Sequence, residues 1–403
     1  MRARSGFRTR RAFLKATAAA AAPYMLTSAA LGAEGRAPAN DRIAMAAIGI
    51  GGRGSGNMRG FMNFAQVQMI AACDVVQAKR DGAKNAIDQK YGNKDCKAYN
   101  DFREVVARPD IDAVSVATPD HWHGLVTIAA CRNGKDVFCE KPLSLTIREG
   151  RAMVEAARRY GRVFSSGSQR VLGDYGGLAK YIRSGAIGEV KEAYVSVGGP
   201  SRPCNLPPEP VPPGIDWDLW LGPAPWAPFN RGRLNFRPWR DYSGGGMTDW
   251  GGHKFGAVIF AMDLQETGPA EICPPDAKDH KLLTYVYANG FRIHHLGGPD
   301  ITYVGTLGEA SRGKMGKPPR DVPLMGYRGS GGIQGDFLHC VRSREKPFRD
   351  VEFAHRAATV CHLGNIAYWL ERPLKWDPVK EEFIGDDEAN RWLDRPKREP
   401  WRL

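Results

Sequence analysis

The chain has 403 residues, 42% of them hydrophobic and 25% charged, a globular composition with enough apolar material for about two domains. Its formal net charge of +13 at pH 7 does not indicate nucleic-acid binding, because the Lys and Arg side chains beyond the N-terminus are scattered and form no basic stripe. The eight cysteines include no Cys-x-x-Cys pair, which argues against a zinc finger, and most are expected to be buried as small hydrophobic side chains.

Residues 1–33 have the features of an export signal that is removed from the mature protein. A twin-arginine sequence from Thr9 to Lys15 precedes an alanine-rich stretch over 16–22, and small residues over 28–33 offer a cleavage site. The apolar stretch is short and weakly hydrophobic, so no stable membrane insertion is expected. Six positive charges lie here without an acid, and their removal leaves +7. The segment resembles signals of the Tat pathway, so we expect the Tat export machinery as a partner and a periplasmic location.

The stretch from Ile43 to Asp74 predicts a dinucleotide-binding unit. An apolar run over 43–48 leads into a glycine turn, a helix to Phe64, and a second apolar run over 67–73 that ends at Asp74. The first glycine of such a turn allows a sharp bend, the second lets backbone approach a pyrophosphate, and the third allows close helix–strand packing. The expected cofactor contacts in this unit are Gly49, Gly51, Gly52, Arg53, Gly54 and Asp74.

Asp74 favours NAD over NADP, because a carboxylate accepts hydrogen bonds from the 2′-hydroxyl group and repels a 2′-phosphate. Arg53, Lys79 and Arg80 offer the alternative of a cation that binds the extra phosphate. We favour ordinary solvated roles for these three residues, and therefore NAD.

Strands and helices continue to alternate, which predicts an NAD-binding Rossmann domain with a parallel sheet over 41–165. Helices are expected over 77–91, to 107, to 133 and over 148–160, and strands over 112–117, 137–139 and 162–165. Because ligands lie beyond the carboxyl ends of such strands, the residues after two of them are expected at the cofactor: Thr118, Pro119, His121, His123, Glu140 and Lys141. For the two histidines we favour cofactor contact or a structural cap over metal binding, since no third ligand lies nearby.

The remaining chain predicts an α+β domain over 166–376 with a large, mainly antiparallel open sheet. Alternating runs over 190–197, 281–287, 291–295 and 301–305 have the pattern of its strands, and helices over 337–341 and 353–370 are expected to cover it. The segment 198–243 is rich in Pro, Trp and Gly, and a loop of that length is usually functional or an intersubunit arm. Residues 377–403 are expected to form a charged tail that wraps a neighbouring subunit.

Asp249 and His253 have the spacing that places two side chains on one face of a helix, here expected over 249–262. A histidine titrates near neutrality and can take a hydroxyl proton, and an aspartate beside it would orient the ring. The alternative is an N-capping aspartate with an incidental histidine. Arg170 and Tyr242 are further candidates for substrate contact.

The glycine turn with Asp74, the sequence over 117–123 and Glu140-Lys141-Pro142 together resemble the glucose–fructose oxidoreductase/inositol dehydrogenase (Gfo/Idh/MocA) family. The resemblance implies a cis peptide bond before Pro142, a Lys141 that touches both nicotinamide and the reacting hydroxyl group, and a second catalytic motif in Asp249 and His253. It also implies a sheet face that makes a subunit interface, hence a homo-oligomer, either a dimer or a tetramer. Lys254 departs from the second histidine of many exported relatives, which bears on the substrate.

These features predict an exported oxidoreductase, with tightly bound NAD, that interconverts a hydroxyl group and a ketone on a sugar, glycoside or cyclitol. His253, Lys141 and Asp249 are its expected catalytic residues. One alternative is an NAD-dependent glycoside hydrolase that works through transient oxidation and elimination. Another is a nucleotide-bound sugar sensor without catalysis.

Overall fold

The computed structural model describes residues 38–276, 279–296 and 300–403, so the predicted export signal lies outside the described residues. Residues 43–403 form one unit and residues 1–42 belong to another, of which a short 3₁₀ helix, Ala39–Asp41, is described. The following account concerns residues 43–403.

The first sheet is parallel throughout and has the strand order β3-β2-β1-β4-β5-β6. Its strands are mostly continuous apolar runs, because helices cover both faces of such a sheet. The strand order reverses between β1 and β4, which is where a crevice opens beyond the carboxyl ends. The strands are β1 (Ile43–Ile48), β2 (Val67–Cys73), β3 (Lys97–Tyr99), β4 (Ala113–Val116), β5 (Asp136–Cys139) and β6 (Phe164–Ser166).

The helices of this part lie where the sequence predicts them. Their bounds are α3 (Gly52–Phe61), α4 (Gln77–Tyr91), α5 (Phe102–Val106), α6 (Asp120–Arg132) and α7 (Ile147–Arg159). The end of α4 shows why the prediction works there: Gly92 follows it in the left-handed conformation, with φ of 67°, and its N–H donates to Asp88. Strand β3 is too short for a periodic pattern and was not predicted.

The second sheet is mixed but mostly antiparallel, as predicted, with β10 and β7 as its one parallel pair among the described strands. Its order is β12-β11-β7-β10-β9-β8-β13-β14. The strands are β7 (Val190–Val195), β8 (Glu271–Cys273), β9 (Thr284–Val286), β10 (Arg292–His295), β11 (Ile301–Gly305), β12 (Gly308–Ser311), β13 (Leu374–Asp377) and β14 (Glu382–Phe383).

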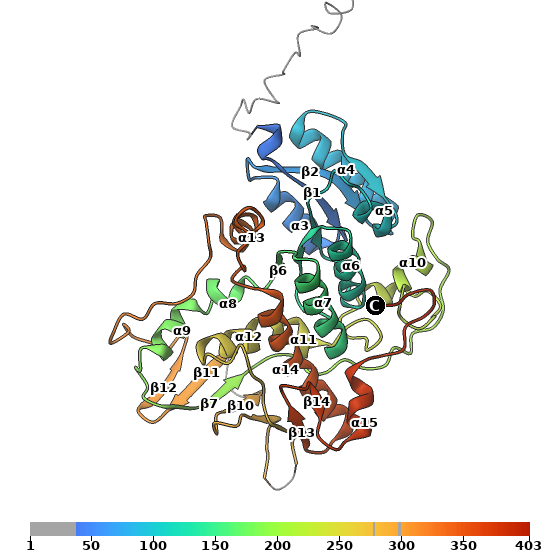
Figure 1. Cartoon of the computed structure of the whole chain (residues 1–403). Coiled ribbons are helices and arrows are strands. Elements are labelled where there is room, and N and C mark those ends of the chain that lie inside the picture. Colours follow the sequence, from blue (N-terminus) through green and yellow to red (C-terminus); the bar gives the residue numbers. More distant parts are fainter. Residues whose placement is uncertain (1–37, 277–278, 297–299) are drawn as a thin grey trace, which may run out of the picture. The chain divides into compact units, whose positions relative to one another are not determined.

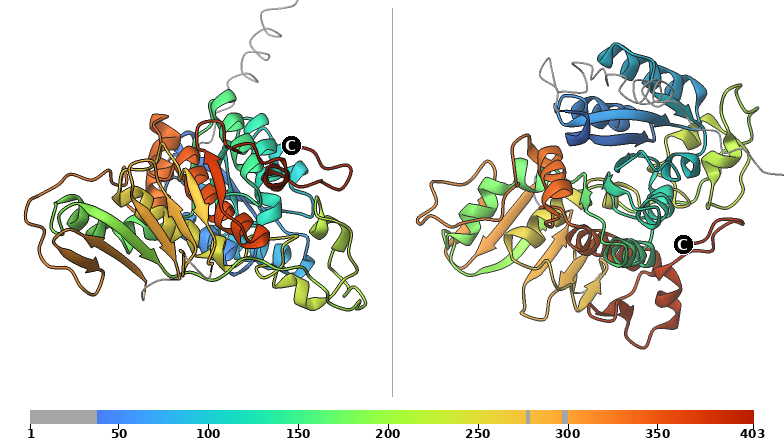
Figure 2. Two further views of the ribbon diagram at one scale, coloured as in Figure 1. Left: turned by 90° about the horizontal axis from the view of Figure 1, so that it is seen from below. Right: turned by 45° about the horizontal axis from the view of Figure 1, so that its top comes forward.

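Helices cover one face of this sheet (Figures 1 and 2) and share one apolar core with it. They are α8 (Arg170–Gly173), α9 (Gly176–Arg183), α12 (Gly251–Ala261) and α14 (Val351–Leu370). Helix α13 (Gly332–Ser343) corrects the prediction for 337–341: it packs on the first sheet, where Phe337 meets Phe61 and Phe138 with ring centroids 6.0 and 5.8 Å apart.

Residues 198–243 form a strap, the name used below for this segment. It contains α10 (Trp217–Leu221) and a 3₁₀ helix (Arg231–Leu234), and it has an apolar cluster of its own that includes Trp217, Trp220 and Phe229. The strap is tied to the start of α4, since Gln77 N donates to Gly214 O at 2.8 Å.

Residues 377–403, predicted as a charged tail, pack on their own chain. Strand β14 extends the second sheet, and α15 (Asp387–Asn390) and a 3₁₀ helix (Arg391–Leu393) follow it. The chain then runs back to the first sheet, where the Trp401 ring lies 4.7 Å from that of Trp122. The aromatic side chains therefore anchor this segment on its own chain.

All eight cysteines are free thiols, and all except the partly buried Cys204 are buried. This confirms their interpretation as small hydrophobic side chains, and burial raises the pKa of Cys96, for example, to about 12.

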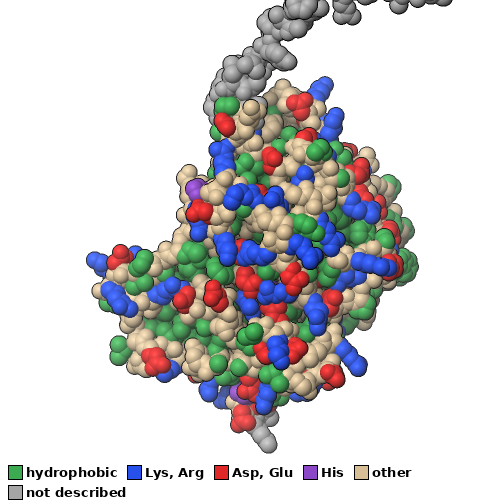
Figure 3. Space-filling view, viewed as in Figure 1, with side chains coloured by type: hydrophobic (Ala, Val, Ile, Leu, Met, Phe, Trp, Pro, Cys, Tyr) green, Lys and Arg blue, Asp and Glu red, His purple; other side chains and the backbone are tan. Residues whose placement is uncertain are grey.

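None of the described helices is long and apolar enough to cross a membrane. Charged side chains of both signs share the face shown in Figure 3.

Candidate active site

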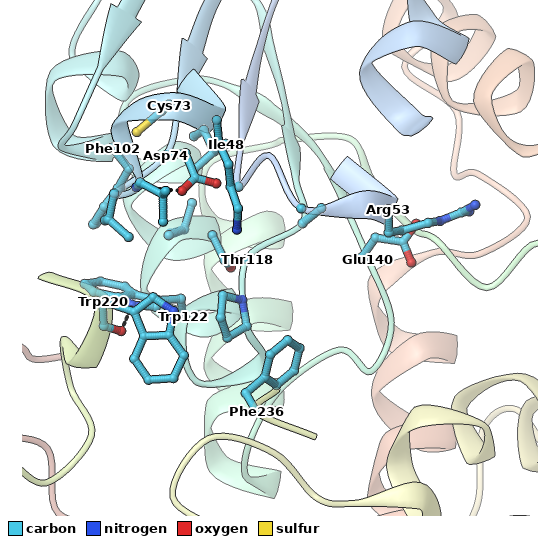
Figure 4. Close-up of a pocket in the computed structure, with 18 of the residues that line it drawn as sticks. Ile48, Arg53, Cys73, Asp74, Phe102, Thr118, Trp122, Glu140, Trp220 and Phe236 are labelled. Atoms are coloured by element: carbon cyan, nitrogen blue, oxygen red, sulfur yellow. Dashed lines mark hydrogen bonds and ion pairs between the residues drawn. The ribbon is translucent and has the colours of Figure 1, made fainter. Parts of the chain in front are cut away.

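A cavity of about 430 Å³ opens beyond the carboxyl ends of β1, β2, β4 and β5 (Figure 4). It brings together most of the residues that the sequence predicts for the cofactor: Gly49, Gly51, Gly52, Arg53, Asp74, Thr118, Pro119, Glu140 and Lys141. Gly54, His121 and His123 are not among its lining residues, and they support it from behind in different ways.

The glycine turn is held by close backbone packing. Gly49 has φ of +85°, and a Cβ on Gly54 would lie 1.9 Å from the main-chain oxygen of Gly49. At the start of α3 the situation is opposite, because a Cβ on Gly51 or Gly52 would meet no atom within 4 Å. The N-terminus of α3 therefore has open space beside it at the wall of the cavity, which suits a phosphate group.

Asp74 joins the first two βα turns. Its carboxylate accepts hydrogen bonds from Ile50 N at 2.7 Å and from Val76 N at 2.8 Å. Arg80 donates to the main-chain oxygen of Asp74 and to Asn100, each at 3.2 Å. Arg53 binds Glu140, with Nε 2.6 Å from Oε1, so both arginines hold protein oxygens in this structure, while Lys79 lines the cavity.

His121 and His123 act as structural caps, the second of the two roles that the sequence leaves open for them. Both are buried, at 1% exposure. The ring nitrogens of His123 bond the main-chain oxygens of Pro142 and Thr118, at 2.8 and 3.0 Å, which ties the ends of two strands together. His121 Nε2 lies 3.1 Å from the main-chain oxygen of Trp220. Neither side chain is among the residues that line the cavity in this structure.

Lys141 projects from the turn after β5 into the cavity, next to a cis peptide bond at Pro142. Its Nζ donates to Asp249 twice, to Oδ1 at 2.6 Å and to the main-chain oxygen at 2.8 Å. The positive charge of Lys141 is thus fixed by two oxygens of one residue.

A break in the helix makes the second of these bonds possible. The sequence predicts one helix from Asp249, but α11 (Gly246–Asp249) ends there and α12 begins at Gly251. His253 N donates to Trp250 O at 3.1 Å, three residues back, so the oxygen of Asp249 has no such helical partner and accepts from Lys141.

His253 lies on the first turn of α12 and is 4% exposed. Its Nδ1 is buried without a hydrogen-bond partner, so Asp249 does not orient the ring as the i, i+4 spacing predicts; its carboxylate turns to Lys141 instead. Burial, followed by the positive charges of Lys141, Arg170 and Arg349, lowers the pKa of His253 to about 3. The imidazole is therefore neutral at pH 7. It lies beyond the residues that line the cavity.

The two predicted substrate contacts differ. Arg170 pairs with Asp174 at 2.5 Å, and its guanidinium lies 5.1 Å from the ring centroid of Trp250, the residue at the helix break. Tyr242 has no exposed surface, and its hydroxyl group bonds Arg233 inside the strap. Tyr242 therefore packs the strap and does not reach a substrate in this conformation.

Sequence reasoning missed the residues by which the strap closes the cavity. These are Leu219, Trp220, Leu234, Phe236 and Arg237. Arg237 also reaches the predicted catalytic residues, with Nε 3.1 Å from Oδ1 of Asp249. The Trp-rich composition of residues 198–243 was the available sequence signal for a role at the site, but composition does not indicate which side chains line the cavity.

The residues of the cavity fit a dinucleotide. Open space lies at the N-terminus of α3, the Asp74 carboxylate lies on the wall, and the buried hydroxyl group of Thr118 has no hydrogen-bond partner. Apolar side chains on both sides of the cavity, such as Phe102 on α5 and Trp220 in the strap, offer surfaces for flat rings.

This fold and cavity define a dinucleotide-binding protein of the oxidoreductase class. The match to "Oxidoreductase family, NAD-binding Rossmann fold" covers residues 43–168, and the match to "Oxidoreductase family, C-terminal alpha/beta domain" covers residues 201–403. The chain belongs to this family, Gfo/Idh/MocA, as its motifs predict.

Two of the relatives are named as dehydrogenases of a polyol and of a glucoside. Inositol 2-dehydrogenase of Salmonella paratyphi B is 34% identical over 139 residues, 34% of this chain and 40% of the relative. D-Glucoside 3-dehydrogenase of Escherichia coli is 30% identical over 142 residues, 35% of this chain and 38% of the relative. Each match spans less than half of the relative. Scyllo-inositol dehydrogenase of Lactobacillus casei, solved with NAD(H) and scyllo-inositol, shares the fold: its TM-score is 0.59 at 15% identity, over 83% of this chain and 99% of that one.

Proposed function

We propose that the protein is an exported NAD-dependent oxidoreductase that interconverts a hydroxyl group and a ketone on a sugar, glycoside or cyclitol. The observation that carries the proposal is the ammonium group of Lys141, fixed by Asp249 at the wall of a dinucleotide-shaped cavity. The names of the relatives, inositol 2-dehydrogenase and D-glucoside 3-dehydrogenase, support the substrate class.

Lys141 is the proposed contact to the reacting hydroxyl group. An ammonium group has three N–H donors, and Asp249 uses two of them, which leaves one for a substrate oxygen. A positive charge beside that oxygen makes the hydroxyl group more acidic. Bound NAD supplies the acceptor for the hydride that leaves the adjoining carbon.

His253 is the proposed acceptor of the hydroxyl proton, since it is neutral at pH 7 and its chain neighbour lies beside the lysine: a Cβ on Gly252 would be 3.6 Å from Lys141 Cβ. We assign Asp249 to hold Lys141 and not to orient His253. Arg170, which stacks on Trp250 and acts electrostatically on His253, remains a proposed substrate contact.

We propose NAD as the cofactor because the Asp74 carboxylate lies on the cavity wall, while Arg53 and Arg80 have other partners. The strap supports tight binding, because its residues line the cavity and the strap would have to move before the cofactor could leave. It is tied down at the adenosine end, where Trp122 Nε1 donates to Trp220 O at 3.1 Å and Asn100 Nδ2 donates to Asp216 Oδ2 at 2.7 Å.

Export supports the same proposal. The twin-arginine sequence fits the Tat machinery and a periplasmic location, where free NAD is scarce and a lost cofactor would not be replaced. A cofactor that stays bound must be recycled within each cycle, by a second substrate or a redox-neutral reaction. We further propose a homo-oligomer, formed through the uncovered face of the second sheet.

The test is to purify the mature protein, extract its nucleotide, and screen glycosides and cyclitols by mass spectrometry. We expect stoichiometric NAD after dialysis and a keto product together with reduced nicotinamide. Absence of nucleotide would contradict tight binding, and a cofactor spectrum that no sugar changes would favour the sensor. Release of an unoxidised sugar from an aryl glycoside without net NADH would identify the hydrolase instead.

A further inference from the structure

The surroundings of Asp249 and His253 contain more positive than negative charge. Lys141 and Arg237 share one oxygen of Asp249, at 2.6 and 3.1 Å. Arg349 is 2% exposed, its Nε and Nη2 have no hydrogen-bond partner, and its charge acts on His253. Buried N–H donors without acceptors are costly, so a negative group that binds nearby would be stabilised.

The other acid near these groups does not balance the charge. Asp120 lines the cavity but is buried at 3% exposure, and its Oδ2 accepts from the hydroxyl group of Ser243 at 2.6 Å. Burial raises the pKa of Asp120 to about 6, so most of its negative charge remains at pH 7, but that charge interacts more strongly with His123 than with Lys141.

The Nη1 and Nη2 groups of Arg237 are the part of its guanidinium that can bind a ligand. Its Nε bonds Asp249, and the group stacks on Phe236 at 4.9 Å, which holds its plane. The side chain lines the cavity and is 50% exposed, and within the described parts of the chain its Nη1 and Nη2 have no partner. Two parallel N–H groups in a fixed plane match the two oxygens of a carboxylate.

We propose that the substrate is an acidic sugar, a uronic acid or its glycoside, whose carboxylate is bound by Nη1 and Nη2 of Arg237. The inference rests on the proposed function, since it names the substrate class of the same site. Oxidised NAD carries one positive charge on its nicotinamide ring and two negative charges on its pyrophosphate. The N-terminus of α3 is the expected site of the pyrophosphate, so the charge that the cofactor adds at the reacting end of the cavity is positive.

Under this proposal His253 becomes a stronger base when the substrate binds. Positive neighbours and burial keep its pKa low in the free site. A carboxylate beside Arg237 offsets part of that field and raises the pKa of His253 as substrate binds, because an opposite charge favours the protonated form. A neutral sugar has no such effect.

The experiment uses the NAD-bound mature protein and a matched pair of sugars, methyl β-glucuronide and methyl β-glucoside. Calorimetry measures binding, and the absorbance of the bound reduced nicotinamide measures a single round of sugar oxidation. We expect the glucuronide to bind at least about 10-fold more tightly, as a charge-assisted hydrogen bond implies.

The variants test Arg237 itself. Arg237→Gln should weaken glucuronide binding about 10- to 100-fold and glucoside binding less than about 3-fold, and Arg237→Lys should have an intermediate effect. Arg231→Gln, the same change at an exposed site on the strap, should alter neither.

Equal binding of the two sugars by the wild-type protein would overturn the inference. So would an equal loss for both sugars in Arg237→Gln, which would show that Arg237 acts only through Asp249, or tighter binding of methyl glucoside 6-phosphate than of the glucuronide. If Arg237→Gln does not fold, the proposal is tested by comparing the binding of the two sugars to the wild-type protein and to Arg237→Lys. Oxidation of the glucoside without preference for the glucuronide would refute this inference alone. Selective binding of the glucuronide without oxidation would refute the proposed function alone.

Discussion

The ammonium group of Lys141 lies 2.6 Å from Oδ1 of Asp249 and 2.8 Å from the main-chain oxygen of the same residue. The two residues are 108 positions apart, and they meet because α11 ends at Asp249 and leaves that oxygen without a helical partner. An interruption of the helix thus converts a main-chain oxygen into a fixed acceptor for the proposed catalytic lysine.

Replacing Lys141 by alanine should abolish turnover while the protein keeps its NAD. The side chain is the proposed donor to the substrate oxygen, and a positioned group of this kind contributes about 100- to 10,000-fold to the rate. Turnover of sugar and nucleotide content of the purified variant are the two measurements. Turnover at the wild-type rate would remove Lys141 from the mechanism.

The glycine turn permits a graded series. Gly54→Ala should destabilise the fold by about 3 kcal/mol, because its Cβ would overlap the main-chain oxygen of Gly49. Gly51→Ala meets no atom within 4 Å, so it should fold normally and bind NAD more weakly. Gly56→Ala, on the exposed side of α3, is the control and should stabilise the helix by about 0.5–1 kcal/mol.

Thermal unfolding and nucleotide content measured on all three variants separate the two effects. Gly51→Ala protein that retains stoichiometric NAD after dialysis would show that the phosphate does not approach this backbone. A Gly54→Ala variant as stable as the wild type would contradict the close packing of the turn.

Strong local patterns allowed the sequence to predict most of this fold. Helix α4 has a glycine in the left-handed conformation at its end, and β2 ends at Cys73, directly before Asp74, as predicted. Propensity, turn chemistry and burial agree at both places. The cavity residues of the first sheet could be grouped because parallel strands place their ends together.

The features that failed depend on contacts between distant segments. The pattern through 249–262 continues across Trp250, so nothing local indicates the break at which Lys141 binds. The burial of Tyr242 and the approach of Arg237 to Asp249 follow from how the strap folds on itself and crosses the cavity. Aromatic composition predicted that the strap has a function and could not predict its path.

Anchoring of the strap by the C-terminal segment should slow loss of the cofactor. Trp401 packs on Trp122, and Arg398 Nε donates to the main-chain oxygen of Gly222 in the strap at 2.9 Å. Removing residues 398–403 should therefore speed NAD release by about 10-fold or more, while the protein stays folded. Trp401→Ala should have a smaller effect in the same direction.

Nucleotide release is measured by dilution of the NAD-bound protein with a trap for free NAD. Arg402→Ala is a suitable control, since its side chain pairs only with the nearby, exposed Glu399 within the described structure. Identical release rates for the truncated and full-length proteins would show that the strap needs no such anchor.

Buried neutral histidines should make the protein sensitive to acid. Burial lowers the pKa of His121 and of His362 from 6.5 to about 4. Between these two values the unfolded chain binds a proton that the folded chain does not, so stability falls as the pH falls from about 6.5 toward 4. Each histidine should cost about 2 kcal/mol between pH 7 and pH 5.

The free energy of unfolding measured against pH in the wild type and in His362→Asn provides the check. The slope of the free energy of unfolding against pH gives the number of protons taken up on unfolding. In the variant this number should be smaller by up to one in this pH range, whatever its overall stability. An unchanged slope would show that His362 does not remain neutral in the folded protein.

The account depends on Lys141 and His253 acting on one hydroxyl group, and a crystal structure of the NAD-bound protein with an unreactive sugar analogue measures this directly. The account predicts that Lys141 Nζ and a ring nitrogen of His253 both lie within about 3.2 Å of the same sugar oxygen. A sugar oxygen bound by one of these groups, with the other more than about 6 Å away, would contradict it.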